Sequence, residues 1–293
     1  MQHVLERRGT RRARLAGLAV GLVAAAGFAS SASAAVAPDY TQFQYCPKSA
    51  PNVQACFYSE TTGGSFKLGN ATVPINKTIV LQGGIAQNPT TFQTTFVNAV
   101  GAPTLSPTKL SVPGGLSGLF DPDPGWNGIL TELWQAAVNS VNGVTATAEL
   151  VGPVQYDLLN FVSNSGAALV LPIRVKLDNP FLGDSCYIGS SSNPVTLRLT
   201  TGTTAPPPPN TPITGSQGVV DFPTPDGQLL TATGFRLVDN AFSVPAATGC
   251  GPLLFRPLIN AAVNLKEGFP SPAGNNHAIL TGSFKQATAT AVP

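Results

Sequence analysis

The stretch from Ala168 to Ser190, ALVLPIRVKLDNPFLGDSCYIGS, decides the fold class of the chain. Apolar residues occupy every second position of its first half: Leu169, Leu171, Ile173, Val175 and Leu177. From Arg174 onward the intervening positions are charged, so a β-strand here has one apolar and one charged face. Asn179-Pro180 ends the strand, because proline lacks an N–H for the sheet and disfavours helical backbone before it. The stretch therefore predicts a half-buried β-strand.

Other segments of the chain repeat this pattern. Alternation or strand-like composition is found at residues 65–68, 77–81, 90–97, 109–112, 143–151, 155–162, 195–200, 228–244 (with a bulge expected at Gly234) and 277–289. Helical spacing of apolar residues occurs at 127–142, and residues 257–265 are expected to form a second short helix with Pro257 in its first turn. We therefore predict an all-β fold, an antiparallel β-sandwich with one or two short helices packed against it.

The first 34 residues have the features of a secretory signal peptide. Five arginines precede an apolar run that is too short to cross a bilayer comfortably, and Ala32-Ser33-Ala34 fits a cleavage site. The arginine pair also partly resembles a twin-arginine export motif, so either export route stays open. We expect residues 1–34 to be removed and residues 35–293 to form a secreted, extracellular β-rich domain without a later membrane span.

Removal of the signal peptide changes the charge of the chain. Lys plus Arg falls from 16 to 11 and Asp plus Glu from 14 to 13, so the net charge changes from +2 to about −2. No basic stripe remains, which argues against nucleic acid or an anionic membrane as a partner. The partner expected from the sequence is an unidentified extracellular ligand or a component of the cell envelope.

The four cysteines of the exported part predict disulfides, because exported proteins fold under oxidising conditions. Three connectivities are possible, and we favour Cys46–Cys56 with Cys186–Cys250. The first pair closes a short loop, and the second ties the central strands to the last third of the chain. Free thiols or a metal site are the alternative, but no C-x-x-C spacing is present.

Two further segments allow more than one interpretation. Residues 201–218 contain four consecutive prolines and are either a long surface loop or an inter-domain linker, of which we favour the loop. Aromatic residues gather around the first cysteine pair and either pack a sheet or form a sugar-binding face: Tyr40, Phe43, Tyr45, Phe57 and Tyr58.

The sequence contains few residues suited to catalysis. His277 is the only histidine after the signal peptide, no G-x-S-x-G motif occurs, and we interpret this histidine as a solvent-exposed turn residue. The run from Asp121 to Glu132 resembles a calcium-binding loop, but its glycine is one position early. Nothing in the spacing singles out a pair among the candidate carboxylates Asp121, Asp123, Glu132, Glu149, Asp157, Asp178, Asp184, Asp221 and Asp226. We predict no catalytic residue, no metal site and no cofactor.

Three segments of the second half are similar to parts of uncharacterised secreted proteins of actinobacterial type. These are residues 178–189, 248–251 and 269–276. That group has no assigned activity, so the resemblance implies only export and the pairing of Cys186 with Cys250. The function expected is a non-enzymatic extracellular or cell-envelope protein that acts by surface binding or structure. Two alternatives are a secreted carbohydrate-active enzyme with two carboxylates and a carrier of a small apolar ligand.

Overall fold

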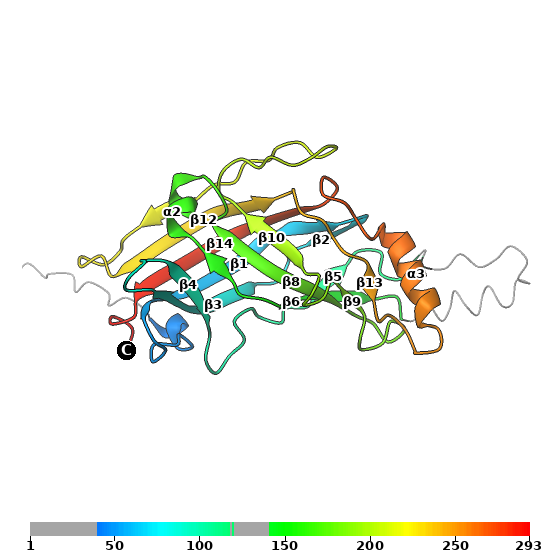
Figure 1. Ribbon diagram of the computed structural model, residues 1–293, viewed down its shortest axis with the longest axis horizontal. Helices are drawn as coiled ribbons and strands as arrows, with labels where there is room; N and C mark the ends of the chain where they lie inside the picture. Colours follow the sequence, from blue (N-terminus) through cyan, green and yellow to red (C-terminus); the bar gives the residue numbers. More distant parts are fainter. Residues whose placement is uncertain (1–39, 118, 120–140) are drawn as a thin grey trace, which may run out of the picture. The chain divides into compact units, whose positions relative to one another are not determined.

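The computed structural model describes residues 40–117, 119 and 141–293. The segment Pro38–Pro293 clusters into one compact unit. The strands of the described residues form two seven-stranded sheets that are packed together, and every strand pair among these residues is antiparallel (Figure 1). The predicted all-β sandwich is therefore confirmed.

The first sheet is built around two long strands, β1 (Val53–Leu68) and β14 (His277–Thr288). Its order is β11 (Val219–Asp221), β12 (Leu229–Asp239), β14, β1, β3 (Ile79–Gln87) and β4 (Thr94–Asn98), with β2 (Ala71–Pro74) paired to β1. The register shifts in β12 between Thr233 and Phe235, where Gly234 has a φ of +68°. This is the bulge expected at Gly234, because a left-handed backbone is favourable mainly for glycine.

The second sheet is built around β8 (Leu169–Asp178), the strand predicted from the opening stretch. Its order is β13 (Ala247–Thr248), β9 (Tyr187–Ile188), β8, β6 (Val144–Leu150) and β5 (Leu110–Val112), with β7 (Gln155–Tyr156) and β10 (Val195–Leu199) also paired to β8. The apolar positions of β8 are buried, whereas Arg174 lies on the outer face. There its guanidinium pairs with Glu149 at 2.7 Å and covers the ring of Tyr187 at 4.1 Å.

The core between the sheets contains an aromatic cluster centred on Phe284 of β14. Its ring lies 4.9 Å from that of Phe161 and 5.5 Å from that of Phe57, between ring centroids. Phe57 comes from β1 and Phe161 from the short helix α2 (Leu158–Ser163), so the cluster joins a helix to the first sheet. Aromatic pairs at such separations add stability beyond the area they bury.

Residues 155–162 were expected to form a strand, and this is wrong for most of the segment. Only Gln155–Tyr156 is a strand, and α2 follows directly. The Asp157 carboxylate accepts a hydrogen bond from the Asn160 N–H at 3.0 Å and so caps the helix. Asn164 ends the helix in the left-handed conformation. The predicted helix at 127–142 lies almost wholly outside the described residues, as do the signal peptide and the calcium-like run.

The proline-rich segment 201–218 lies within the same compact unit as the sheets. Thr203 bridges to Thr214 inside the segment, and Ser216 bridges to Arg236 of β12. The structure therefore places this segment as a surface extension of the first sheet. No helix among the described residues is long and apolar enough to cross a membrane.

Candidate functional site

The helix α3 (Arg256–Glu267) lies at the end of the described unit that is remote from the C-terminus (Figure 1). The sequence predicts a helix here, with Pro257 in the first turn. Backbone N–H groups of the first turn have no partner within the helix, so the N–H that proline lacks is not needed there. Gly268 ends the helix with a φ of +66°, and the Phe269 N–H binds the Asn264 carbonyl. The sequence thus defines both ends of α3.

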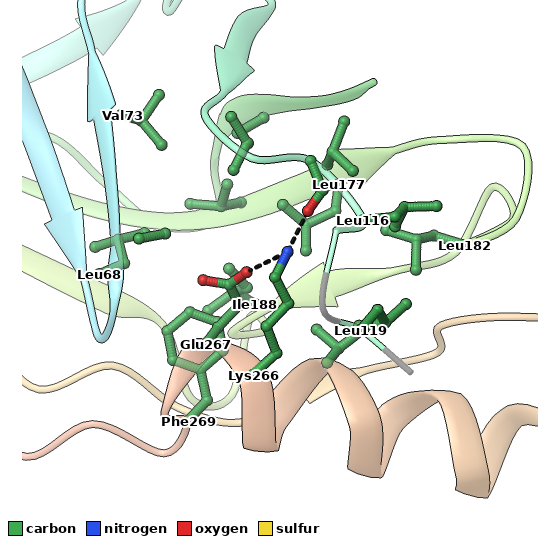
Figure 2. Close-up of a pocket in the computed structure, with 17 residues that line it drawn as sticks. Leu68, Val73, Leu116, Leu119, Leu177, Leu182, Ile188, Lys266, Glu267 and Phe269 are labelled. Carbon is green, nitrogen blue, oxygen red and sulfur yellow. Dashed lines mark hydrogen bonds and ion pairs between the residues drawn. The ribbon is translucent and has the colours of Figure 1, made fainter. Parts of the chain in front are cut away.

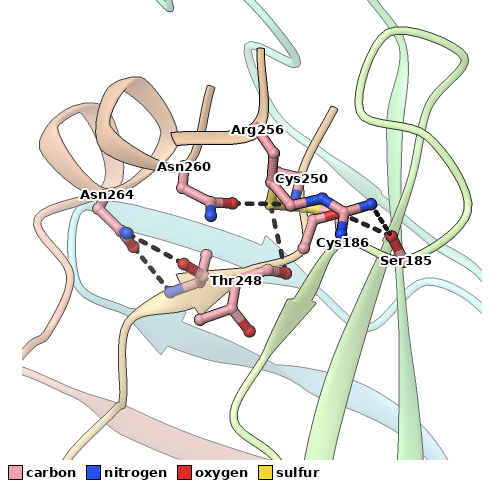
Figure 3. Close-up of a disulfide and its surroundings, with 9 residues drawn as sticks. Ser185, Cys186, Thr248, Cys250, Arg256, Asn260 and Asn264 are labelled. Atoms are coloured by element: carbon pink, nitrogen blue, oxygen red, sulfur yellow. Dashed lines mark hydrogen bonds between the residues drawn. A yellow bond between two sulfur atoms is a disulfide. The ribbon is translucent and has the colours of Figure 1, made fainter. Parts of the chain in front are cut away.

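The polar side chains of α3 point towards the protein rather than towards solvent (Figure 3). The Asn260 side-chain oxygen accepts a hydrogen bond from the Cys250 N–H at 2.8 Å. Asn264 binds both backbone groups of Ala247, at 2.7 Å to the N–H and 3.0 Å to the carbonyl. These bonds fix the helix against β13 and against the turn that carries Cys250.

The C-terminal end of α3 is attached to the other sheet. The Asn70 N–H donates to the Glu267 carbonyl at 2.8 Å, and the Asn70 side chain donates to the Lys266 carbonyl at 2.9 Å. Asn70 belongs to the turn between β1 and β2. The helix is therefore held at both ends, by the second sheet at its start and by the first sheet at its finish.

The outward face of α3 and the turn before it are apolar. Every residue classed as exposed between 252 and 268 is apolar: Pro252, Leu253, Leu254, Phe255, Pro257, Leu258, Ala261, Leu265 and Gly268. Leu253, Leu254 and Leu265 are each at least 80% exposed. We call the five large side chains the α3 apolar surface: Leu253, Leu254, Phe255, Leu258 and Leu265. α3 also buries Ile259 and Val263 in the core, so it carries apolar side chains on both its inner and its outer face. Surface helices usually direct polar residues to solvent, which makes the exposed leucines unusual.

A row of small apolar cavities begins beneath α3 and continues between the sheets. The cavity under the helix has a volume of about 50 Å³, and two others, each of about 40 Å³, share walls with their neighbours. Lys266 supplies the polar end of the first, where its ammonium lies between the Glu267 carboxylate, at 3.3 Å, and the Gly115 carbonyl (Figure 2). Ligand pockets usually measure roughly 300–1,000 Å³. These cavities are far smaller and give little support to the carrier hypothesis.

Two disulfides are present, Cys46–Cys56 and Cys186–Cys250, which are the pairs favoured from the sequence. Cys186 lies just before β9, and Cys250 lies in the turn between β13 and α3. Both of these cysteines are fully buried. The second bridge therefore links the edge of the second sheet to the turn from which the α3 apolar surface projects (Figure 3).

Most of the described candidate carboxylates have separate structural contacts. Glu149 pairs with Arg174, Asp157 caps α2, and Asp178 pairs with Lys176 at 2.8 Å and with Lys109. These two lysines lower the pKa of Asp178, chiefly through the hydrogen bond from Lys176. Asp221 and Asp226 accept hydrogen bonds from the backbone within their own turns. Asp178 and Asp184 both raise the pKa of Lys176, Asp178 chiefly through its hydrogen bond, so these two acids share one lysine as a partner. Asp121, Asp123 and Glu132 lie outside the described residues.

His277 is not the exposed turn residue expected from the sequence. It is the first residue of β14, is half-buried, and places its Nε2 3.4 Å from the Ser65 hydroxyl. Burial lowers its pKa, and the nearby Lys67 lowers it further. A serine hydrolase needs a carboxylate to orient the histidine, and here the neighbouring charge is a cation.

The described residues contain no group of three or more His, Cys, Asp or Glu side chains that could hold a metal ion. The sequence did not reveal the α3 apolar surface, although the run Leu253-Leu254-Phe255 next to Arg256-Pro257-Leu258 was a signal for it. Comparisons of the chain with protein-family models, curated proteins and solved structures find no match.

Proposed function

We propose that the protein is exported and acts as a non-enzymatic binding protein of the cell envelope, docking through the α3 apolar surface onto the aliphatic part of envelope lipids. The observation that carries this proposal is the apolar outer face of α3. Its asparagines bind inward to the backbone, and its leucines face solvent. The two disulfides and the signal-like residues 1–34 support export.

Lipid chains fit this surface better than a folded protein partner does. Protein interfaces combine an apolar centre with a polar rim and roughly one hydrogen bond per 100–200 Å². The most exposed positions from 252 to 268 are all apolar, and the polar side chains of α3 are only partly exposed. Because the helix is fixed at both ends, its leucines are already arranged for insertion and little ordering entropy opposes it.

Association with phosphatidylcholine vesicles tests the proposal. Wild-type protein should sediment with neutral vesicles, and added salt should change the bound fraction little, since the attraction is apolar. The triple variant Leu254→Ser/Leu258→Ser/Leu265→Ser should bind at least about 100-fold more weakly, because each substitution removes an apolar side chain worth about 1.5 kcal/mol or more when buried.

A matched control separates this site from general hydrophobicity. Phe92→Ser/Val219→Ser/Phe222→Ser also removes three exposed apolar side chains, each more than half exposed, and should leave vesicle binding unchanged. Equal losses in both triple variants, or no vesicle binding by the wild type, would contradict the proposal. Self-association that is lost only in the α3 triple variant would instead identify a second copy of the chain as the occupant.

A further inference from the structure

A second, polar groove lies on the outer face of the first sheet, at the end of the unit opposite to α3. Its volume is about 380 Å³, which falls within the range of ligand pockets. The lining residues are Thr41, Gln42, Gln44, Tyr58, Glu60, Ser283, Phe284 and Lys285. This groove differs from the cavities between the sheets in both size and chemistry, because all but one of its lining residues are polar.

The floor of the groove is formed by the two central strands of the sheet. Tyr58 of β1 lies opposite Lys285 of β14, and Glu60 lies opposite Ser283. The Tyr58 hydroxyl donates to the Glu60 carboxylate at 2.8 Å. Burial and this carboxylate raise the pKa of Tyr58 to about 12, so its hydroxyl keeps its proton at neutral pH. The floor is therefore rigid and carries both hydrogen-bond donors and acceptors.

The wall of the groove is the short 3₁₀ helix η1 (Thr41–Phe43) together with Gln44. Phe43 is buried against Cys56, Leu229 and Ala287, on the outer face of the sheet. The Cys46–Cys56 disulfide ties the same segment to β1. The wall is thus fixed to the floor by a covalent bond and by its own small core, which preorganises the groove for a ligand.

We propose that this groove binds a neutral saccharide. Sugar hydroxyls both donate and accept hydrogen bonds, and the groove offers amides, hydroxyls and a carboxylate that do the same. Tyr58 adds an aromatic ring, which supplies apolar contact area with one polar end. The single carboxylate and the single ammonium of the groove have opposite charges, which favours a ligand without net charge. One carboxylate is too few for glycoside hydrolysis by a pair of acids, so binding is the expected activity.

Titration calorimetry with maltohexaose, cellohexaose and chitohexaose tests this site. At least one of these probes should bind with a dissociation constant below about 1 mM. Glu60→Gln keeps the size of the side chain but replaces the ionised acceptor with a weaker neutral one, and Tyr58→Ala removes aromatic contact area. Each should weaken that binding at least about tenfold. Lys77→Ala, an exposed lysine in the loop before β3, is the matched control and should bind as the wild type does.

Thermal unfolding of each variant distinguishes a lost site from a lost fold. A variant that melts as the wild type does but has lost the saccharide supports the proposal. Absence of binding by all three probes at about 10 mM, or wild-type binding by both Glu60→Gln and Tyr58→Ala, would overturn it. The α3 triple variant should retain saccharide binding, so failure of vesicle docking and failure of this site remain separate results.

Discussion

Replacing Cys186 and Cys250 together with alanine should lower the free energy of unfolding by about 4 kcal/mol, because the bridge closes a loop of 64 residues that the unfolded chain otherwise explores freely. Both cysteines are fully buried, and the Cys250 backbone N–H also donates a hydrogen bond to the side-chain oxygen of Asn260 in α3. Urea unfolding of the double variant, followed by circular dichroism, measures the loss.

The second disulfide provides a matched control. Cys46→Ala/Cys56→Ala opens a loop of only 10 residues and should cost about 3 kcal/mol in the same chain-entropy model. The two double variants should also differ in function. Loss of Cys186–Cys250 should weaken vesicle docking through α3, whereas loss of Cys46–Cys56 should weaken saccharide binding, because it releases the wall of the groove. An unchanged unfolding midpoint in the Cys186/Cys250 variant would show that packing alone holds this end of the molecule.

Secondary structure was predicted best from the sequence where one face of an element is buried and the other is charged. β8 is the clearest case, because a period of two is retained from Leu169 to Asp178. α3 was found because Pro257 suits the first turn of a helix, although the predicted end at 265 falls short of Glu267. The first part of β1 was expected only as a strand pair somewhere within residues 38–62, because Ser59 and Thr61 take buried positions where an apolar residue would mark a strand. The length of β1 follows from pairing with β3 and with β14, and β14 lies far along the chain.

The candidate sites were harder to predict than the fold. The exposure of Leu254 and Leu258 depends on which way α3 is rotated, and Asn260 and Asn264 set that rotation by binding backbone groups of another strand. The polar groove likewise depends on η1 lying over Tyr58. Of the aromatic residues around the first disulfide, Phe43 and Phe57 pack in cores, as one of the two interpretations expected, and Tyr58 lines the polar groove.

Asn276 lies where three loops meet, and no periodic pattern of apolar residues in the sequence indicates this position. Its side chain is fully buried, and its oxygen accepts a hydrogen bond from the Gly69 N–H at 2.8 Å. Its amide nitrogen donates to the carbonyls of Phe242 and Pro272, both at 3.0 Å. One amide therefore satisfies backbone groups of three separate loops just before β14, the strand at the centre of the first sheet.

Asn276→Ala should consequently be among the most damaging single substitutions, with a loss of about 4 kcal/mol in the free energy of unfolding. It removes the hydrogen-bond partner of the buried Gly69 N–H and of the Phe242 carbonyl, and each such group costs about 1–3 kcal/mol. The Pro272 carbonyl loses one of two bonds, since it also accepts from the Asn275 N–H. Asn276→Asp keeps the shape of the side chain but should lower the free energy of unfolding further at neutral pH, because a carboxylate would face the carbonyl oxygens to which the amide now donates.

The adjacent residue, Asn275, provides the control: Asn275→Ala should change the free energy of unfolding by less than about 1 kcal/mol. Urea unfolding of the three variants measures these differences. Equal stability of the Asn275 and Asn276 alanine variants would contradict the prediction, because it would mean that the loops rearrange to give their backbone groups other hydrogen-bond partners.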